Sequence, residues 1–356
     1  SAVLGDEPQA NGNFSPVSLY LALAMTQMGA AGETRDEIAT ALGSSDAAAT
    51  AEQCGNLMRL LATDHLSDVR LANSVWMRPD AQFKQPFVDA MRDQFYASLF
   101  LADFGTGAAD KAMAQWIADN TEGTLNPAFK SQEGQLLSLI DTVYFKSEWA
   151  KAFDAEATVP GTFAAEGGDV QAAFMVQRLD RPQEIRQTEA YTRANLGFVD
   201  GSEMTFVLPA EGRGVQDLLA DGALLEEAFA GESTGEAFVT YRVPKFAFDS
   251  SYGLIPALER LGVVAAFGDQ ADFSNLSDTP AYVSSVAQES RIGLDENGVE
   301  ASAYTKVDIM EMSALPDSSV VEELEFNLDR PFLYEIRTRQ GIPLFVGLCA
   351  QPDAVA

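Results

Sequence analysis

Residues 299–309 read VEASAYTKVDI and alternate strictly between two kinds of side chain. The odd positions are apolar or small: Val299, Ala301, Ala303, Thr305, Val307 and Ile309. The even positions are Glu300, Ser302, Tyr304, Lys306 and Asp308. A period of two over eleven residues predicts a β-strand with one buried and one solvated face. The following residues, MEMSALPDSSVVEELEF (310–326), include Met, Ser and Pro and then an acidic run, so no tight hairpin turn ends this strand.

The composition indicates a globular chain with an acidic surface. Its 356 residues suffice for one large domain or for two or three average ones, and 47% of them are hydrophobic. The formal net charge is −30 and there is no basic run, which argues against nucleic acid, heparin-like polymers and anionic membranes as partners. We interpret the acidity as a solubility feature or a salt-adapted surface. We find no signal peptide, and no apolar run approaches the roughly 18 residues that a membrane span needs.

Helical and strand patterns are mixed along the chain. Ser15 and Pro16 begin a helical pattern that ends near Gly29, and a second helix is predicted from Glu33 to Leu42. The stretch GQLLSLIDTVYFKSEW (134–149) predicts a long strand covered on both faces. The stretch RPFLYEIRTRQGIPLFVGLCAQP (330–352) predicts two strands joined by a turn at 339–341. Without a regular βαβ rhythm or a linker, these patterns predict a single α+β domain over residues 1–356.

The residues of common catalytic sites are absent. The chain has one histidine, His65, and it lacks a G-x-S-x-G elbow, an H-E-x-x-H motif, a calcium loop and a phosphate-binding glycine loop. Cys54 and Cys349 are not at metal-ligand spacing, and the sequence leaves open whether they form a disulfide. We therefore predict no catalytic residues and no metal site, and we expect a protein that is not an enzyme.

Six blocks, taken together and in this order, resemble the signature blocks of the serpin superfamily, in a prokaryotic-type member. They are residues 13–38 (NFSPVSLYLALAMTQMGAAGETRDEI), 141–149 (DTVYFKSEW), 243–248 (VPKFAF), 258–277 (LERLGVVAAFGDQADFSNLS), 282–303 (YVSSVAQESRIGLDENGVEASA) and 326–347 (FNLDRPFLYEIRTRQGIPLFVG). The resemblance implies a single serpin domain with three β-sheets, one of them large and central, eight to nine helices and an exposed reactive-centre loop. The family's first helix looks truncated to its last turn.

The resemblance also implies a mechanism that accounts for the alternation in residues 299–309. In inhibitory serpins a protease cleaves the reactive-centre loop and becomes acyl-linked to it. The loop then inserts as a central strand of the large sheet and distorts the protease, so the inhibitor works once. A loop with this fate needs the pattern of a strand before it is paired.

By resemblance, the hinge and the reactive-centre loop occupy residues 296–325. The hinge residues that match the inhibitory pattern E-x-G-[TS]-E-A-x-A are Glu296, Gly298, Val299, Glu300, Ala301, Ser302 and Ala303. Val299 stands where Thr or Ser is usual, and Tyr304 interrupts the small residues on the outer face. Counting the usual loop length from Glu296 predicts the scissile bond at Met312-Ser313. The segment after Ser313 is longer than usual, so Met310, Glu311 and Leu315 remain alternative cleavage positions.

Five further residues correspond to the region where the large sheet opens. Asp141 and Gln288 stand where the family usually has Asn and His, beneath Ser15 and Ser18. We expect the Asp141 carboxylate to accept a hydrogen bond from the Gln288 amide. Trp149 corresponds to the tryptophan at the end of the sheet where the loop first enters.

The resemblance implies serine proteases of the chymotrypsin-like, elastase-like or subtilisin-like kind as partners, because Met312 suits an apolar primary pocket. Papain-like cysteine proteases are a further class. We expect a monomer, no cofactor and no heparin site, since Arg59 is the one cation in residues 51–68. The resemblance favours an extracellular or cell-surface location. The alternative is a non-inhibitory serpin that acts as a binding or chaperone-like protein.

Overall fold

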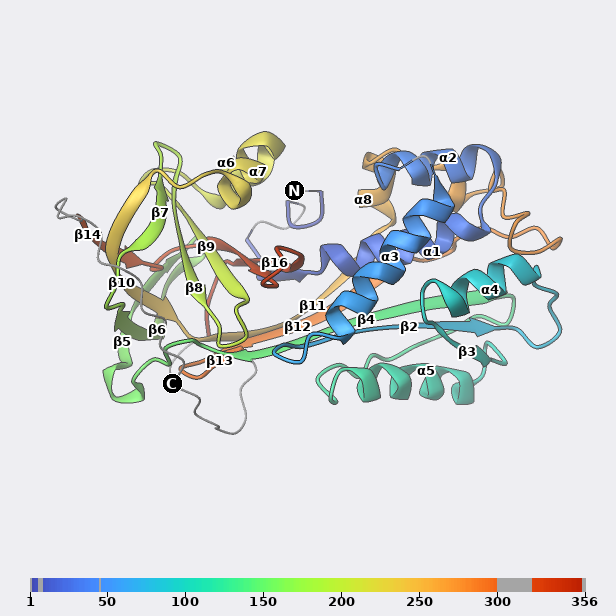
Figure 1. Ribbon diagram of the computed structural model, residues 1–356, viewed down its shortest axis with the longest axis horizontal. Coiled ribbons are helices and arrows are strands. Elements are labelled where there is room, and N and C mark those ends of the chain that lie inside the picture. The colour runs from blue at the N-terminus through green and yellow to red at the C-terminus, as the bar shows by residue number, and fades with distance from the viewer. Residues whose placement is uncertain (1, 6–8, 45, 300–321, 354–356) are drawn as a thin grey trace.

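The computed structural model describes residues 2–5, 9–44, 46–299 and 322–353. Figure 1 shows a long sheet that runs across the molecule, a second and strongly curved sheet at one end, and helices on both faces of the long sheet. The helices are α1 (Pro16–Gly29), α2 (Gly32–Ala41), α3 (Ala47–Ala62), α4 (Gln85–Asp93), α5 (Gly107–Asn120), α6 (Val215–Ala220), α7 (Gly222–Ala230) and α8 (Ile255–Arg260), with 3₁₀ turns at Ala155–Ala157 and Ala265–Phe267. None of the helices in the described part of the chain is both long and apolar enough to span a membrane.

The long sheet has six strands in the order β11-β12-β13-β4-β2-β3. They are β11 (Phe246–Gly253), β12 (Ala287–Leu294), β13 (Gly298–Val299), β4 (Leu137–Glu148), β2 (Asp68–Met77) and β3 (Ser98–Leu101). β4 is the central strand predicted from residues 134–149, and it is antiparallel to β2 over ten residue pairs. Helices α1 and α3 lie on one face of this sheet and α5 lies on the other (Figure 1).

The strand β13 is two residues long and joins the two halves of this sheet at one end only. Val299 pairs with Leu294 of β12 on one side and with Ser147 of β4 on the other. Beyond this bridge, the described residues of β4 and β12 form no ladder with each other. The six-stranded sheet is therefore split along most of its length.

The second sheet has ten strands and follows the path β1-β16-β15-β9-β8-β7-β10-β6-β5, with β14 paired to β10. They are β1 (Gly12–Phe14), β16 (Pro343–Cys349), β15 (Phe332–Arg337), β9 (Glu203–Pro209), β8 (Tyr191–Gly197), β7 (Gln183–Gln187), β10 (Gly235–Pro244), β6 (Gly168–Arg178), β5 (Val159–Ala165) and β14 (Glu322–Asn327). The first residues of β10 pair with β7 and its last residues pair with β6. We expected two smaller sheets beside the large one, but β10 joins them into a single ten-stranded sheet. The predicted final hairpin is β15 and β16, with Gly341 at a φ of 81° in its turn.

Helix α1 connects the two sheets because it packs against both β4 and β16. Its start follows from the sequence: the Ser15 side chain accepts a hydrogen bond from the Ser18 backbone N–H at 3.3 Å, and Pro16 lies in the first turn. Leu21 and Met25 of this helix are fully buried in the main hydrophobic cluster, which also includes residues of both sheets. The position of α1 therefore depends on the same core that holds β4.

Candidate functional site

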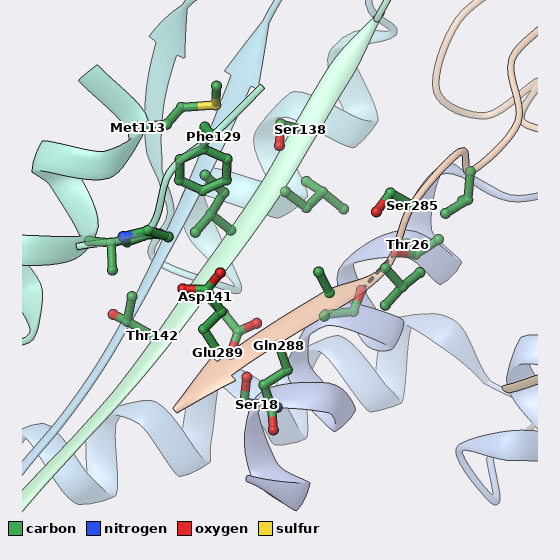
Figure 2. Close-up of a pocket in the computed structure, with 18 of the residues that line it drawn as sticks. Ser18, Thr26, Met113, Phe129, Ser138, Asp141, Thr142, Ser285, Gln288 and Glu289 are labelled. Atoms are coloured by element: carbon green, nitrogen blue, oxygen red, sulfur yellow. Dashed lines mark hydrogen bonds between the residues drawn. The ribbon is translucent and has the colours of Figure 1, made fainter. Parts of the chain in front are cut away.

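The split between β4 and β12 opens a groove with a volume of about 730 Å³. Ser18 and Thr26 of α1 line it on one face of the sheet, and Met113 of α5 and Phe129 of the following loop line it on the other. Figure 2 shows these residues around the gap between the two strands. The groove lies where an additional strand of the six-stranded sheet would lie.

The hinge residues close one end of this groove. Val299 is 4% exposed. A Cβ on Gly298 would lie 2.2 Å from the Ser147 carbonyl oxygen, so no larger residue fits where the hinge approaches β4. The Asp295 side chain accepts hydrogen bonds from the backbone N–H groups of Asn297 (2.8 Å) and Gly298 (3.3 Å). These contacts hold a tight turn between β12 and β13.

Glu296 anchors the hinge to Lys245, which lies between β10 and β11, and to Thr158, which directly precedes β5. Its carboxylate accepts hydrogen bonds from the Lys245 ammonium at 2.7 Å and from the Thr158 hydroxyl at 2.8 Å. Burial opposes ionisation of Glu296, but these hydrogen bonds outweigh burial and hold its pKa below the usual range. Sequence analysis missed Lys245 and Thr158, although Lys245 lies inside one of the signature blocks.

Trp149 lies beside the turn that precedes the hinge. It is 2% exposed and stacks on Phe198 with ring centroids 4.6 Å apart. Its indole Nε1–H donates to the Asp295 carbonyl oxygen at 3.0 Å, and its backbone N–H donates to the Asn297 carbonyl oxygen at 2.8 Å. Trp149 thus holds the turn that precedes the hinge.

Gln288 attaches β12 to the start of α1. Its amide oxygen accepts from the Ser15 backbone N–H at 2.8 Å, and its amide nitrogen donates to the Ser15 carbonyl oxygen at 3.0 Å. The expected hydrogen bond from Gln288 to Asp141 is therefore wrong. Both ends of the amide bind the Ser15 backbone, and the groove separates β12 from the strand that carries Asp141.

Asp141 lies on β4 and faces the groove. Its Oδ2 atom is buried and has no hydrogen-bond partner among the described residues. Burial raises the pKa of Asp141 to about 7, and a hydrogen bond from the Ser18 side chain offsets part of this effect. The structure therefore separates the four residues predicted near the opening into two pairs, Ser15 with Gln288 and Ser18 with Asp141.

Glu289 on β12 is a second carboxyl group at the groove, which sequence analysis missed although it follows Gln288 directly. Partial burial raises its pKa, and the nearby carboxylate of Asp249 raises it further. Asp249 itself pairs with Arg291 at 2.8 Å. Figure 2 shows Asp141 and Glu289 at the gap from opposite strands.

Several predicted site residues lie outside the described residues. They are Glu300, Ala301, Ser302, Ala303, Thr305, Val307, Ile309 and the cleavage positions Met310, Glu311, Met312, Ser313 and Leu315. Cys54 and Cys349 are described, and both are buried free thiols, which answers the question of a disulfide between them. Within the described ranges, no group of three or more His, Cys, Asp or Glu side chains is arranged to hold a metal ion.

The α+β fold, the split in the six-stranded sheet and the bridge formed by Gly298 and Val299 at one end of that split together indicate the class of protein. The family described as "Serpin (serine protease inhibitor)" matches residues 1–352, and the chain belongs to this family. It is 31% identical to Serpin-ZXA of Oryza sativa subsp. japonica, with 95% of this chain and 89% of the relative covered. It is 30% identical to Iripin-3 of Ixodes ricinus, with 97% and 90% covered.

The fold agrees with that of solved serpins. The native-state structure of the thermophilic serpin tengpin aligns with a TM-score of 0.81 and 25% sequence identity, and the alignment covers 96% of this chain and 88% of tengpin. The expected α+β serpin fold is therefore confirmed. Serpins are in general protease inhibitors that act by insertion of the reactive-centre loop, and most are not catalysts.

The anchor at Glu296 yields a prediction. Replacing Lys245 by Met leaves the largely buried Glu296 carboxylate, 14% exposed, with Thr158 as its remaining side-chain donor. We expect a loss of about 1–2 kcal/mol in the free energy of unfolding, measured by urea denaturation of the intact protein. The matched control is Lys151→Met, because Lys151 pairs with an Asp180 that is 85% exposed and should contribute less than about 1 kcal/mol. Equal losses in the two variants would contradict the anchor.

Proposed function

We propose that this chain is an inhibitory serpin: a suicide inhibitor of serine proteases that is cleaved in the segment after residue 299 and then inserts that segment into the groove. The observation that carries the proposal is the split between β4 and β12: in the described part of the chain these strands do not pair with each other, and Gly298 and Val299 lie between them at one end. An open ladder edge on both sides offers unpaired backbone groups to an incoming strand.

The length of the groove supports this occupant. Continuing the pairing of Val299 with Ser147 predicts residue 305 opposite Asp141 and residue 309 opposite Leu137. Leu137 is the first residue of β4, and residue 309 is the last of the alternating segment. The alternating segment therefore has the length of the strand beside which it would lie. Cleavage must then follow residue 309, which agrees with the expected bond Met312-Ser313 and with the alternative positions Met310, Glu311 and Leu315.

The free energy that insertion would release is comparable with the free energy of unfolding of a protease. Insertion would bury Val307 and Ile309, each worth about 1.5–3 kcal/mol, and add ladder hydrogen bonds on two sides at about 0.5–1.5 kcal/mol each. The sum is on the order of 10 kcal/mol or more. Folded proteases of ordinary stability are held by about 5–15 kcal/mol, so insertion can distort one.

We infer that the targets are chymotrypsin-like, elastase-like or subtilisin-like proteases, because Met312 fits an apolar primary pocket. Papain-like cysteine proteases are a further target class, and we expect the inhibitor to be monomeric. The test is to mix the protein with chymotrypsin, elastase and subtilisin and to examine the products on a denaturing gel and by intact mass. A complex that survives boiling and carries the mass of protease plus the larger fragment supports inhibition. Plain cleavage with continued protease turnover would instead support the non-inhibitory alternative.

A pair of loop variants makes the test specific for insertion. Ala303→Arg places a charge on the inward face, and burying it without a partner costs roughly 3–5 kcal/mol, so we expect cleavage without complex formation. Tyr304→Arg places the same charge on the outer face and should preserve the complex. The measurement is the number of inhibitor molecules consumed per inactivated protease. Equal values for both variants would rule out insertion in this register.

A further inference from the structure

Asn297 is an exposed residue in the tight turn between β12 and β13, and Gly298 follows it directly. The Asn297 side-chain amide forms no hydrogen bond with any described residue, whereas its backbone N–H donates to the Asp295 side chain at 2.8 Å. Glycine has no Cβ, so nothing on the next residue blocks the approach of the Asn297 side chain to the Gly298 backbone nitrogen. An asparagine that is free to rotate before a glycine is the usual setting for spontaneous deamidation.

We propose that Asn297 is a site of spontaneous modification, where the chain converts to isoaspartate as the protein ages, and that this conversion disrupts the hinge. The Gly298 backbone nitrogen attacks Cγ of Asn297 and forms a succinimide ring. The side-chain amide nitrogen leaves as ammonia and takes the proton that the Gly298 nitrogen loses. A water molecule then opens the ring at the former backbone carbonyl carbon to give isoaspartate, or at Cγ to give aspartate. This inference does not depend on the proposed function.

The chain has a second Asn-Gly pair, Asn11-Gly12, which the fold protects. The Asn11 Oδ1 atom accepts hydrogen bonds from the backbone N–H groups of Ala350 (2.8 Å) and Gln351 (2.9 Å), and its Nδ2 atom donates to the Gln351 carbonyl oxygen at 2.6 Å. Gly12 is buried and pairs with Leu348 in the ladder between β1 and β16. Asn11 can therefore react only after its side chain leaves these hydrogen bonds, which requires local opening of the structure.

The turn around Asn297 slows the reaction but does not prevent it. The Gly298 N–H donates to the Asp295 side chain at 3.3 Å, and the Asp295 backbone N–H donates to the Gly298 carbonyl oxygen at 3.0 Å. These bonds restrain the attacking nitrogen, and the longer of them is weak for an N–H···O hydrogen bond. They leave the Asn297 side chain unrestrained, whereas at Asn11 the reacting amide itself is bound. The fold thus exposes one Asn-Gly pair to modification and shields the other.

The hinge has no room for the longer backbone of isoaspartate. The modification adds one methylene to the backbone between Glu296, which two side-chain hydrogen bonds hold in place, and Val299, which is paired on both sides. Gly298 cannot absorb the extra length by moving toward β4, because a Cβ on it would already lie 2.2 Å from the Ser147 carbonyl oxygen. The modified chain must therefore give up either the Glu296 anchor or the pairing of Val299.

The modification also removes a backbone acceptor and adds a negative charge. The Asn297 carbonyl oxygen accepts a hydrogen bond from the Trp149 backbone N–H at 2.8 Å. In isoaspartate this carbonyl becomes a carboxylate outside the backbone, in a turn that already contains the carboxylates of Asp295 and Glu296. Repulsion between like charges and the longer backbone both oppose the present turn, so we expect the modified hinge to separate from β4.

The first test is to age the intact protein in warm, mildly alkaline buffer and to follow both Asn-Gly pairs. Digestion at low pH and peptide mass spectrometry give the fraction of each asparagine that has become acidic, and an isoaspartyl methyltransferase with a labelled methyl donor identifies isoaspartate. We expect Asn297 to convert at least about tenfold faster than Asn11 in the folded protein. In the urea-unfolded chain the two rates should be similar, because both asparagines precede glycine and no fold holds either one. Equal rates in the folded protein, or the same difference in the unfolded chain, would overturn the assignment.

The second test measures the effect on the hinge. Anion exchange separates the modified fraction of the aged protein, because this fraction carries an additional negative charge. We expect its urea unfolding midpoint to lie roughly 0.3–0.6 M below that of the fresh protein. A modified fraction with an unchanged midpoint would overturn the claim that the hinge cannot accommodate isoaspartate.

Two variants at the same position are the controls. Asn297→Gln has a longer side chain that must close a larger ring, so the aged variant should contain no isoaspartate at this position and should keep its midpoint. Asn297→Asp adds the charge without the methylene, so the fresh variant should show a smaller decrease in the midpoint than the modified wild type. An equal decrease in these two proteins would show that the longer backbone plays no part.

Discussion

Asp141→Asn is expected to stabilise the intact protein at pH 8 and to leave its stability at pH 4 nearly unchanged. Burial raises the pKa of Asp141 from an ordinary value of 3.8 to about 7 in the folded state. Between these two pKa values the folded state binds a proton that the unfolded state has lost, so the wild-type free energy of unfolding falls as the pH rises. The total decrease due to Asp141 is up to about 4 kcal/mol. Asparagine does not titrate, so this contribution should vanish in the variant.

The measurement is urea unfolding of both proteins from pH 4 to pH 8. Asp110→Asn is a control of opposite sign, because hydrogen bonds from the Ser131 hydroxyl and N–H lower the pKa of Asp110. This variant should lose stability at neutral pH, and the loss should shrink as the pH falls through the low folded pKa of Asp110. A difference between wild type and Asp141→Asn that stays constant with pH would show that Asp141 does not titrate in this range.

Trp149→Ala is expected to lower the free energy of unfolding of the intact protein by about 3–5 kcal/mol. The substitution removes a buried indole that stacks on Phe198 and donates to the Asp295 carbonyl oxygen. Trp149→Phe keeps an aromatic ring in the stack and loses the donor, so we expect a smaller loss of about 1–2 kcal/mol.

Trp116→Ala provides the comparison for Trp149, because Trp116 on α5 is only partly buried against a smaller hydrophobic cluster. Guanidinium unfolding of the four proteins, followed by circular dichroism, gives the required free energies. If Trp149→Ala and Trp116→Ala cost the same, the hinge end of the groove does not depend on the stacked indole as we infer.

Much of the architecture follows from local sequence pattern. Local residues alone predict three features: the long strand at residues 134–149, the first two helices and the final hairpin. Each of these segments has its own apolar spacing or its own start and stop residues. Ser15 and Pro16 specify the start of α1 within a few residues. The signature blocks added the family and with it the fold, which the match over residues 1–352 confirms.

The partners inside the site could not be derived in this way. Asp141 and Gln288 were correctly expected near Ser15 and Ser18, but the hydrogen bond between them was wrong, because its formation depends on the distance between two strands that are far apart in sequence. The anchor of Glu296 joins it to Thr158 and Lys245, which are 138 and 51 residues away. The sequence did not predict a place for Glu289 at the groove, because a single glutamate in an alternating strand is ordinary.

The sequence by itself determined the main helices and strands and the strand-like pattern of residues 299–309, because the periodicity of a helix or a strand follows from the spacing of nearby apolar side chains. The tertiary structure alone decided that β4 and β12 do not pair with each other, that Val299 bridges them at one end, and that the Oδ2 atom of Asp141 is buried with no hydrogen-bond partner among the described residues. Those features depend on how α1 and the two sheets pack around one core, and that packing brings together residues that no local pattern relates.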